Sequence, residues 1–450
     1  MAKYKAYPEY KDSEVEWLGD IPGHWKTISI SRLFFRIKRT GYIEKELLSV
    51  YRDYGVIPKS SRDDNNNKPS EDLSPYQLVQ PNDLVMNKMK AWQGSIAISE
   101  YEGIVSPAYF VYQPNNSLFE LAHPKYVHYL LRNPIYVTQY LSRSKGIRVN
   151  QWDLDPDEFR NIELLLPSKV EQEKIYNFLD HETAKIDNLI EKQQQLIELL
   201  KEKRQAVISH AVTKGLNPDV PMKDSGVEWL GKVPALWSLK SYRYACLIYR
   251  GKFGHRPRND PFLYDGDYPF IQTGDVARAS KYIETYSQTL NEKGKAVSQL
   301  FPSGTLMMAI AANIGDTAIL GFEAYAPDSV VGFKPYQNLH LEFLRYSFMA
   351  ALPALEQTST QSTQANLNID RIGAVKAVFP PLEEQLNIID YLDDMLCSYD
   401  SIEANANQAI QLLQERRTAL ISAAVTGKID VRDWVAPAKQ ENEEPQEATA

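Results

Sequence analysis

Two long stretches of the chain place apolar residues at the 3.5 to 3.6 residue spacing of an amphipathic α-helix. One begins after Pro167, and the other begins after Pro380 and Pro381. Each continues for about 45 residues, which at about 1.5 Å per residue predicts a rod on the order of 65 Å long. A helix of that length needs a partner. Because the two stripes match in length, we predict an antiparallel coiled coil within the chain.

The seam of this coiled coil is predicted from the apolar spacing alone. Its members are Ile175, Leu179, Ile186, Leu189, Leu196, Leu200 and Val207 in the first helix, widened by Ile190, Ile197 and Ala211, and Ile388, Leu392, Tyr399, Ile402, Ala409, Leu413 and Leu420 in the second. The alternative is two separate helices, each packed on its own domain.

The segments before each helix show a different pattern, in which Ile, Val, Tyr and Phe alternate between turns of Gly, Pro, Asn and Asp. This pattern is typical of short strands. The expected fold class is α+β, with two strand-rich α/β domains separated by the two long helices in a pseudo-twofold tandem repeat. The predicted divisions are 1–166 and 215–379 for the domains, 167–214 and 380–428 for the helices, and 429–450 for a C-terminal segment with an acidic, disordered tail.

The chain repeats its own sequence at the start of each domain. Residues 11–25 read KDSEVEWLGDIPGHW, and residues 223–237 read KDSGVEWLGKVPALW. The helical stretches also align, with a Glu-Gln pair after the prolines and a shared ISxAVT end. The domains themselves diverge. We therefore infer a tandem duplication that keeps a common frame and carries two different binding domains.

Length and composition narrow the class of protein. A chain of 450 residues with 43% apolar and 24% charged residues is folded and too long for one core. The most apolar stretch, 305–319, is interrupted by Asn313 and Asp316 and is too short to cross a bilayer. The N-terminus has no signal-peptide pattern, so we expect a cytoplasmic protein without a membrane partner. Cys246 and Cys397 are expected to be buried thiols.

The net charge of −8 hides an uneven distribution. Residues 380–436 hold 4 basic and 10 acidic side chains, whereas both domains are close to neutral. Within the domains, residues 26–43, 125–152 and 232–259 carry clustered Lys and Arg without a single acid. Such clusters suit phosphate contacts, although any one of them is equally consistent with a solvated surface.

Sequence motifs for catalysis are missing. The chain has no P-loop, no HExxH, no GxSxG and no [N/D]PP[Y/F] tetrapeptide of an adenine methyltransferase. The nearest match to the last, Asn133-Pro134-Ile135-Tyr136, is interpreted as a turn that breaks a helix. We expect no catalytic residue and no metal site, and interpret the chain as a binding protein.

The duplicated DSxVEWLGxxPxxW opening, the paired PxxxEQ helix starts and the LLxExRxAxISxAVT helices resemble the specificity subunit of type I restriction-modification systems. The resemblance spans nearly the whole chain, and residues 47–59, 81–94 and 268–276 resemble parts of that family's target recognition domains. It implies a subunit without chemistry of its own that binds double-stranded DNA at a two-part site. It also implies two methyltransferase subunits and two restriction subunits as partners. S-adenosylmethionine, ATP and Mg²⁺ are expected on those partners, and no cofactor on this chain.

Residue type gives the candidates for DNA contact, because Arg and Lys suit guanine and phosphate whereas Asn and Gln suit adenine. In the first domain they are Arg36, Lys38, Arg39, Lys88, Lys90, Arg143, Lys145, Arg148 and Asn150. In the second they are Arg250, Lys252, Arg256, Arg258, Asn313, Gln361, Gln364 and Asn366. The repeated Trp17, Trp25, Trp229 and Trp237 are expected to pack at the start of each domain, with base stacking as the alternative.

Two other functions stay open at this point. One is a coiled-coil scaffold whose two globular domains bind proteins, which predicts no affinity for DNA. The other is an enzyme with an unfamiliar site, which requires turnover by the purified chain alone.

Overall fold

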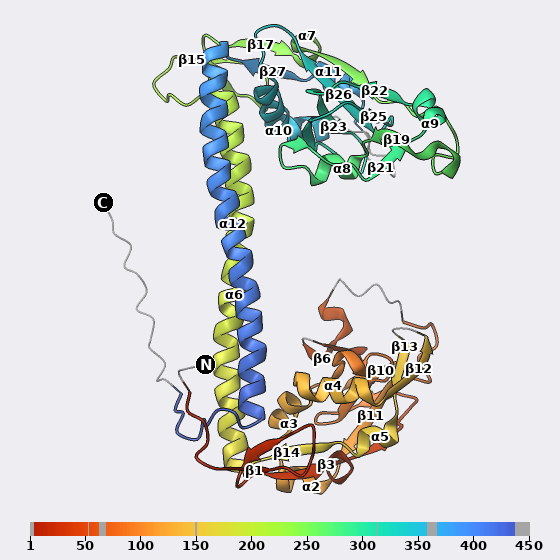
Figure 1. Cartoon of the computed structure of the whole chain (residues 1–450). Helices are drawn as coiled ribbons and strands as arrows, with labels where there is room; N and C mark the ends of the chain where they lie inside the picture. Colours follow the sequence, from red (N-terminus) through yellow and green to blue (C-terminus); the bar gives the residue numbers. More distant parts are fainter. Residues whose placement is uncertain are drawn as a thin grey trace. The chain divides into compact units, whose positions relative to one another are not determined.

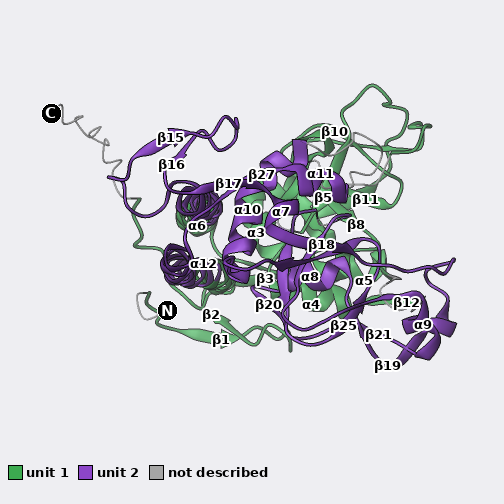
Figure 2. Cartoon of the chain, turned by 90° about the horizontal axis from the view of Figure 1, so that it is seen from above, with its two compact units in different colours: residues 1–193, 408–450 green, residues 194–407 purple. Residues whose placement is uncertain are grey.

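The computed structural model describes residues 4–52, 54–62, 69–148, 151–312, 314–357 and 367–436. The chain forms two compact units, which Figure 2 shows in different colours. The first unit consists of Met1–Gln193 and Gln408–Ala450, and the second of Gln194–Asn407. Each unit therefore contains one strand-rich domain and part of both long helices.

The first domain is built mainly from short strands. The strands are β1 (Tyr10–Asp12), β2 (Asp20–Pro22), β3 (Lys26–Ser29), β4 (Phe34–Ile37), β5 (Leu48–Tyr51), β6 (Gly55–Pro58), β7 (Gln77–Val79), β8 (Leu84–Asn87), β9 (Ile96–Ile98), β10 (Gly103–Val105), β11 (Tyr109–Pro114), β12 (Ser144–Arg148), β13 (Gln151–Leu154) and β14 (Glu163–Leu166). The helices are α1 (Ile30–Leu33), α2 (Asn116–Leu121), α3 (Pro124–Leu131), α4 (Pro134–Ser142) and α5 (Pro156–Arg160), with 3₁₀ turns η1 (Lys59–Ser61) and η2 (Ala91–Gln93).

The main sheet of the first domain has the strand order β4-β11-β8-β9, and all of its neighbours are antiparallel. Strand β14 returns to pair with β3, which brings the end of the domain back to its start. Helices α3 and α4 are separated where Asn133 caps α4 by accepting from the N–H of Ile135 at 2.9 Å, with Pro134 in the first helical turn. The predicted helix-breaking turn at this tetrapeptide is confirmed.

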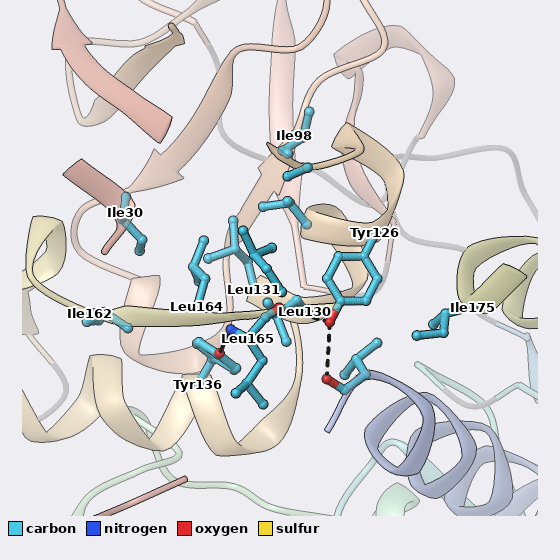
Figure 3. Close-up of a cluster of buried hydrophobic side chains, with 14 of the residues drawn as sticks. Ile30, Ile98, Tyr126, Leu130, Leu131, Tyr136, Ile162, Leu164, Leu165 and Ile175 are labelled. Atoms are coloured by element: carbon cyan, nitrogen blue, oxygen red, sulfur yellow. Dashed lines mark hydrogen bonds between the residues drawn. The ribbon is translucent and has the colours of Figure 1, made fainter. Parts of the chain in front are cut away.

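The core of the first unit joins the domain to both long helices. Figure 3 shows Tyr126 of α3 among buried aliphatic side chains that include Leu165 of β14 and Ile175 of α6. The Tyr126 hydroxyl donates to the carbonyl of Leu165 at 2.9 Å and to that of Val425, at the end of α12, at 3.4 Å. Burial raises the pKa of Tyr126. One continuous core therefore fixes the domain to both helices.

The second domain repeats this plan with changes. Its strands are β15 (Met222–Asp224), β16 (Lys232–Pro234), β17 (Ser238–Ser241), β18 (Cys246–Arg250), β19 (Tyr264–Phe270), β20 (Tyr282–Ile283), β21 (Gln288–Leu290), β22 (Gln299–Phe301), β23 (Leu306–Ala309), β24 (Thr317–Leu320), β25 (Ala324–Ala326), β26 (Val330–Pro335) and β27 (Lys376–Phe379). Its helices are α7 (Tyr242–Ala245), α8 (Thr273–Arg278), α9 (Glu292–Val297), α10 (Leu341–Gln357) and α11 (Ile369–Ala374), with the 3₁₀ turn η3 (Pro261–Leu263).

The main sheet of the second domain has the order β18-β26-β23-β24-β20, so one more strand is added beside β24. That strand, β20, runs parallel to β24, whereas the other neighbours are antiparallel. Strand β17 pairs with β27, as β3 pairs with β14 in the first domain.

The two long helices are α6 (Lys169–Lys214) and α12 (Leu382–Val425), and Figure 1 shows them side by side. In the first unit the start of α6 lies beside the end of α12, where Arg417 Nε is 2.8 Å from Asp187 Oδ1. In the second unit the end of α6 lies beside the start of α12, where Arg204 pairs with Asp400. In the repeat, Asp187 is equivalent to Asp400, and Arg204 is equivalent to Arg417. The two ion pairs are therefore the same contact, with α6 and α12 exchanged. The predicted antiparallel coiled coil and pseudo-twofold repeat are confirmed.

The predicted seam needs correction in the middle of the helices. Among its residues, Ile175, Leu179, Ile186, Ile388, Leu392, Tyr399 and Leu420 are buried, and Leu200, Val207, Ala409 and Leu413 are half-buried. Leu189, Leu196 and Ile402 are instead 46%, 37% and 41% exposed. Ile190 and Ile197, one residue further along α6, are the less exposed positions. The reason is that a 3.6-residue helix drifts by about 20° per heptad from a strict 3.5-residue repeat.

Among the residues covered by the structure, no helix combines the length and the apolar character needed to span a membrane.

Candidate nucleic-acid interface

A tryptophan ties each domain to the helix that follows it. Trp25 and Trp237 are almost completely buried, and their Nε1 atoms donate to Glu171 at 3.0 Å and to Glu384 at 2.9 Å. A carboxylate that is removed from water is stable only where donors reach it, so these bonds fix the domain start to the first turn of the helix. The packing role predicted for these two tryptophans is confirmed.

The other two repeated tryptophans also face the cores. Trp17 lies edge-on to Tyr136 with ring centroids 5.1 Å apart, and Trp229 packs against the core of the second unit. Both side chains are half-buried. Their position supports the packing prediction over base stacking.

The glutamine after each glutamate makes the same contacts in both copies. The Oε1 atoms of Gln172 and Gln385 accept from the backbone N–H groups of His123 and His340, at 2.8 Å in both cases. Both glutamines are fully buried. Their Nε2 atoms each donate to two carbonyls, those of Leu121 and Pro167 in the first unit and those of Asn338 and Pro380 in the second.

A tyrosine provides the third matched attachment. The Tyr129 hydroxyl on α3 donates to Asp180 of α6 at 2.7 Å, and the Tyr346 hydroxyl on α10 donates to Asp393 of α12. Burial, reinforced by the carboxylate, raises the pKa of both tyrosines. Three matched contacts therefore set the orientation of each domain on its helix.

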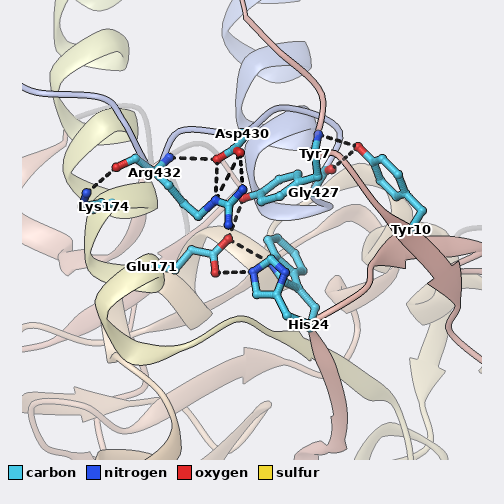
Figure 4. Close-up of polar contacts among 9 residues, drawn as sticks. Tyr7, Tyr10, His24, Glu171, Lys174, Gly427, Asp430 and Arg432 are labelled. Carbon is cyan, nitrogen blue, oxygen red and sulfur yellow. Dashed lines mark hydrogen bonds and ion pairs between the residues drawn. The ribbon is translucent and has the colours of Figure 1, made fainter.

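The first unit has a further polar cluster around Glu171, shown in Figure 4. Glu171 accepts from the Tyr7 hydroxyl at 2.7 Å and lies 2.8 Å from Nε2 of His24. Burial, and then the bond to Glu171, raises the pKa of Tyr7. The backbone N–H of Asp430 donates to the carbonyl of Lys5 at 2.7 Å. The N-terminal segment and the segment after α12 thus meet at the first turn of α6.

The candidate cations around β4 have different surroundings. Arg36 is exposed and lies over the ring of Phe110, with its guanidinium carbon 4.0 Å from the centroid. Lys38 is exposed. Arg39 instead pairs with Asp83, whose pKa is raised by burial despite this pairing. Only 15% of the Arg39 side chain is exposed, so it belongs to the domain's own framework, and its DNA contact stays a prediction.

A second group of candidates gathers at a hairpin. The loop after β8 carries Lys88 and Lys90, and the N–H of Leu154 on β13 donates to the Lys88 carbonyl at 3.2 Å. Lys145 on β12 is exposed and lies 3.6 Å from Asp155. In Figure 1, β12 and β13 lie on the side of the first domain away from α6 and α12. This loop and hairpin form a basic surface that is free of the helix attachments.

Arg143 lies at the end of α4, where its NH1 donates to the carbonyl of Gln139 at 3.3 Å. Arg143 is half-buried and is the C-cap residue of α4. It also lies directly before the hairpin in sequence.

In the second domain three predicted arginines converge on Asp328, two on its carboxylate and one on its backbone carbonyl. Arg258 NH2 lies 2.7 Å from Asp328 Oδ2, Arg256 NH2 lies 3.7 Å from the same atom, and Arg250 Nε donates to the Asp328 carbonyl at 2.9 Å. Lys252 is exposed in the same loop. Three guanidinium groups surround a single carboxylate, which two of them contact, so the cluster keeps a net positive charge that suits a phosphate or a guanine edge.

Several candidates are not described by the structure. Asn150, Asn313, Gln361, Gln364 and Asn366 lie outside the described residues. Arg148 is the last residue of β12, and its side chain is not among those that the structure describes.

The structure adds residues that sequence reasoning missed. Trp92 and Trp152 pack edge to face, with centroids 5.0 Å apart, and hold the β8–β9 loop against the hairpin. In the second domain, Lys293 lies 3.5 Å from the ring centroid of Phe262, which is 63% exposed. Trp92 follows two lysines closely in sequence, which was an available signal. The other contacts depend on tertiary pairing.

The cysteines differ from each other. Cys246 is buried, and burial raises the pKa of its thiol to about 12. Cys397 on α12 is exposed, so the prediction of a buried thiol was wrong there, because its helix turns this position away from the seam. Within the described ranges, no group of three or more His, Cys, Asp or Glu side chains is placed to hold a metal ion.

Comparison with known proteins identifies the family. Residues 22–199 and 250–412 match the type I restriction modification DNA specificity domain. The chain therefore belongs to the family of type I restriction-modification specificity subunits. It is a DNA-recognition subunit of such a system and is not itself catalytic.

Two curated relatives agree with this assignment. The StySPI specificity subunit of Salmonella potsdam is 20% identical over 436 residues, which cover 91% of this chain and 90% of the relative. The EcoBI specificity subunit of Escherichia coli is 31% identical over 91 residues, which cover 20% of this chain and 19% of the relative.

Solved structures support the fold. A chain from a study of complex assembly and conformational transition of the type I R-M system has a TM-score of 0.68 at 15% identity, and the match covers 90% of this chain and 98% of that one. The HsdS subunit of Thermoanaerobacter tengcongensis has a TM-score of 0.50 at 16% identity, with 91% and 98% covered.

Proposed function

We propose that each domain reads one half of a two-part DNA site, and that the paired helices set the number of unread base pairs between the halves. Two methyltransferase subunits and, where present, two restriction subunits would then methylate adenine and cleave DNA at places chosen by this chain. S-adenosylmethionine, ATP and Mg²⁺ would be bound by those partners and not by this chain.

One observation carries the proposal. The attachments of the two domains to α6 and α12 match residue by residue, whereas the exposed basic surfaces differ. Trp25 and Trp237 make equivalent bonds, but Lys145 lies on a hairpin and Arg256 lies in a loop around Asp328. A common frame that carries unlike basic surfaces is what an asymmetric two-part site requires.

The helices support two equivalent partner subunits. Exposed Leu and Ile side chains occur at matching positions of the repeat, with Leu189 and Leu412 in the first unit and Ile402 and Leu199 in the second. Exposed large apolar side chains at equivalent positions favour docking of two copies of the same partner. The acidic α12 would face protein in this arrangement.

The helical spacer gives the sharpest test. Seven residues would be inserted in register in both helices, after Gln194 in α6 and after Asn407 in α12. At about 1.5 Å per residue this adds about 10 Å, or about three base pairs at about 3.4 Å each. Mapping methylated adenines in cells that carry the assembled system should show both half-sites unchanged and the gap longer by about three base pairs. The matched control places the same insertion after Asn217, outside the helices.

Two results would contradict the proposal. One is an altered half-site sequence with an unaltered gap. The other is an assembled complex whose DNA binding ignores both salt and sequence, which would favour the protein-binding scaffold instead.

A further inference from the structure

An open groove of about 770 Å³ lies in the first domain beside the edge strand of its main sheet. Its lining includes Ile98 at the end of β9, Tyr129 on α3, Asp180 on α6 and Arg417 on α12. The exposed rings of Tyr101 and Phe119 also line it, and all of these residues belong to the first unit.

In the second domain the chain itself fills the corresponding space. The N–H of Ile319 donates to the carbonyl of Lys281 at 2.9 Å, and the N–H of Gly321 donates to that of Ile283 at 3.1 Å. These bonds hold β20 along the edge of β24. The Lys281 ammonium lies 2.7 Å from Asp393, the partner of Tyr346.

Matched hydrogen bonds establish that the two places correspond. In the first domain the N–H of Ser99 donates to the carbonyl of Asp83 at 2.9 Å, and in the second the N–H of Leu320 donates to that of Thr305 at 2.8 Å. The residues just before these donors, Ile98 and Ile319, therefore point their N–H groups toward the outer edge of the sheet. Asp180 and Asp393 are also equivalent, because each accepts from the matched tyrosine.

Strand β9 is left as an edge. The Ile98 carbonyl accepts from Nδ1 of His128 at 3.3 Å, but no residue that the structure describes accepts from the Ile98 N–H. His128 receives a bond from Arg132 at its other ring nitrogen, so it caps one carbonyl without adding a strand. An unpaired strand edge is a template for pairing with another polypeptide.

The charges in the groove differ from those of the filled site. The position of Glu342, which lies 2.8 Å from Lys281 in the second domain, is taken by Lys125 in the first. The groove lining contains four cationic side chains, Lys125, Arg132, Lys169 and Arg417, against two carboxylates, Glu100 and Asp180. Lys125 lies 3.6 Å from Asp180, and Arg417 pairs with Asp187 outside the lining, so one positive charge remains in excess. This balance favours an acidic occupant, in contrast to the lysine that fills the second site.

We propose that an extended, acidic segment of a partner subunit enters this groove and pairs with the outer edge of β9, as β20 pairs with β24 in the second domain. The proposal rests on the proposed function, because it assumes assembly with partner subunits. It makes the assembly asymmetric, since only the first domain needs a strand from another chain.

Hydrogen exchange can test this pairing in the full chain. The amide of Ile98 should exchange fast in the free chain and at least about ten times more slowly after assembly with the methyltransferase subunit without DNA. The amides of Ile319 and Gly321 should be slow in both states and serve as the internal control. Equal exchange at Ile98 in the free and the assembled chain would overturn the proposal, and so would protection that requires DNA.

A charge reversal separates this inference from the proposed function. Lys125→Glu places in the first domain the residue type that the second domain has, and it should remove the assembly-dependent protection and weaken partner binding by about tenfold or more. Lys45→Glu is the matched control, because Lys45 is also in an exposed ion pair of the first domain but lies outside the groove lining. If both variants bind the partner equally, the groove proposal fails while sequence-selective DNA binding by the assembly remains a separate measurement.

Discussion

The first and second units attach their domains to α6 and α12 through the same residue types. In both, a tryptophan reaches a glutamate, a glutamine caps a backbone N–H, and a tyrosine reaches an aspartate. Away from the helices the two domains differ, because β20 covers the edge of β24 whereas β9 remains an edge. The comparison teaches that the contacts that orient each domain were kept after duplication, while the contacts that complete it diverged.

The largest expected effect concerns the matched tryptophans. Trp25→Ala and Trp237→Ala should each lower the free energy of unfolding of their own unit by about 3–5 kcal/mol, because each removes a buried ring and one hydrogen-bond donor to a carboxylate. Urea unfolding monitored separately in each unit measures this loss. Trp92→Ala, which truncates a half-buried ring, is the control and should cost clearly less. If only one of the two tryptophan variants destabilised its own unit, the two attachments would not be equivalent.

The next effect concerns the unlike basic surfaces. Replacing Arg250, Arg256 and Arg258 together by alanine should weaken DNA binding by the assembled complex by about 100-fold, because three guanidinium groups are removed from one cluster. The selectivity at the half-site read by the second domain should fall while that at the other half stays. Replacing Arg36 and Lys38 is the reciprocal experiment in the first domain. Equal loss of selectivity at both half-sites in both experiments would contradict separate reading.

A pH difference should distinguish the two units. Burial, and then the charge of Arg132, lowers the pKa of His128 to about 3, whereas the equivalent position in the second domain is Arg345, which stays charged. As the pH falls below about 6.5, His128 binds a proton in the unfolded chain but stays neutral in the folded first unit. The free energy of unfolding of that unit therefore decreases below this pH. At pH 5 the loss should be about 1–2 kcal/mol in the first unit.

The measurement is urea unfolding of the first unit at pH 7 and pH 5, in the wild type and in His128→Gln. The variant should show less loss at the lower pH. An identical loss in both proteins would show that another group carries the pH dependence.

The smallest effect should come from the exchanged ion pairs. Arg417→Ala and Arg204→Ala should each cost less than about 1 kcal/mol, since both pairs are largely exposed to solvent. Double-mutant cycles with Asp187→Ala and Asp400→Ala give the coupling energies, which should agree with each other. Clearly unequal couplings would show that the pseudo-twofold relation fails at the level of single contacts.

The helices could be predicted from the sequence because their apolar spacing is local and occurs twice. Even there, the strict heptad misplaced Leu189, Leu196 and Ile402, since an α-helix of 3.6 residues per turn drifts from a strict 3.5-residue repeat. The packing of Trp25 and Trp237 followed from their repetition in two otherwise unlike domains.

The arrangement of the domains could not be predicted in the same way. Strand pairing joins segments far apart in the chain, so nothing local shows that β20 covers β24 while β9 stays open. Residue type also failed to separate Arg39, which pairs with the buried Asp83, from the exposed Arg36 three residues earlier. The grouping of three arginines around Asp328 likewise depends on a loop that comes from another part of the sequence.

The chain segments that form each unit determine the order in which the two units can fold during synthesis on the ribosome. All residues of the second unit, Gln194–Asn407, lie within one uninterrupted run, whereas the first unit needs Gln408–Ala450 to add Leu420 and Val425 to its core. During translation the second unit can therefore fold as soon as its run has emerged. The domain that precedes it, although made earlier, completes its core only when the residues after Asn407 have been delivered.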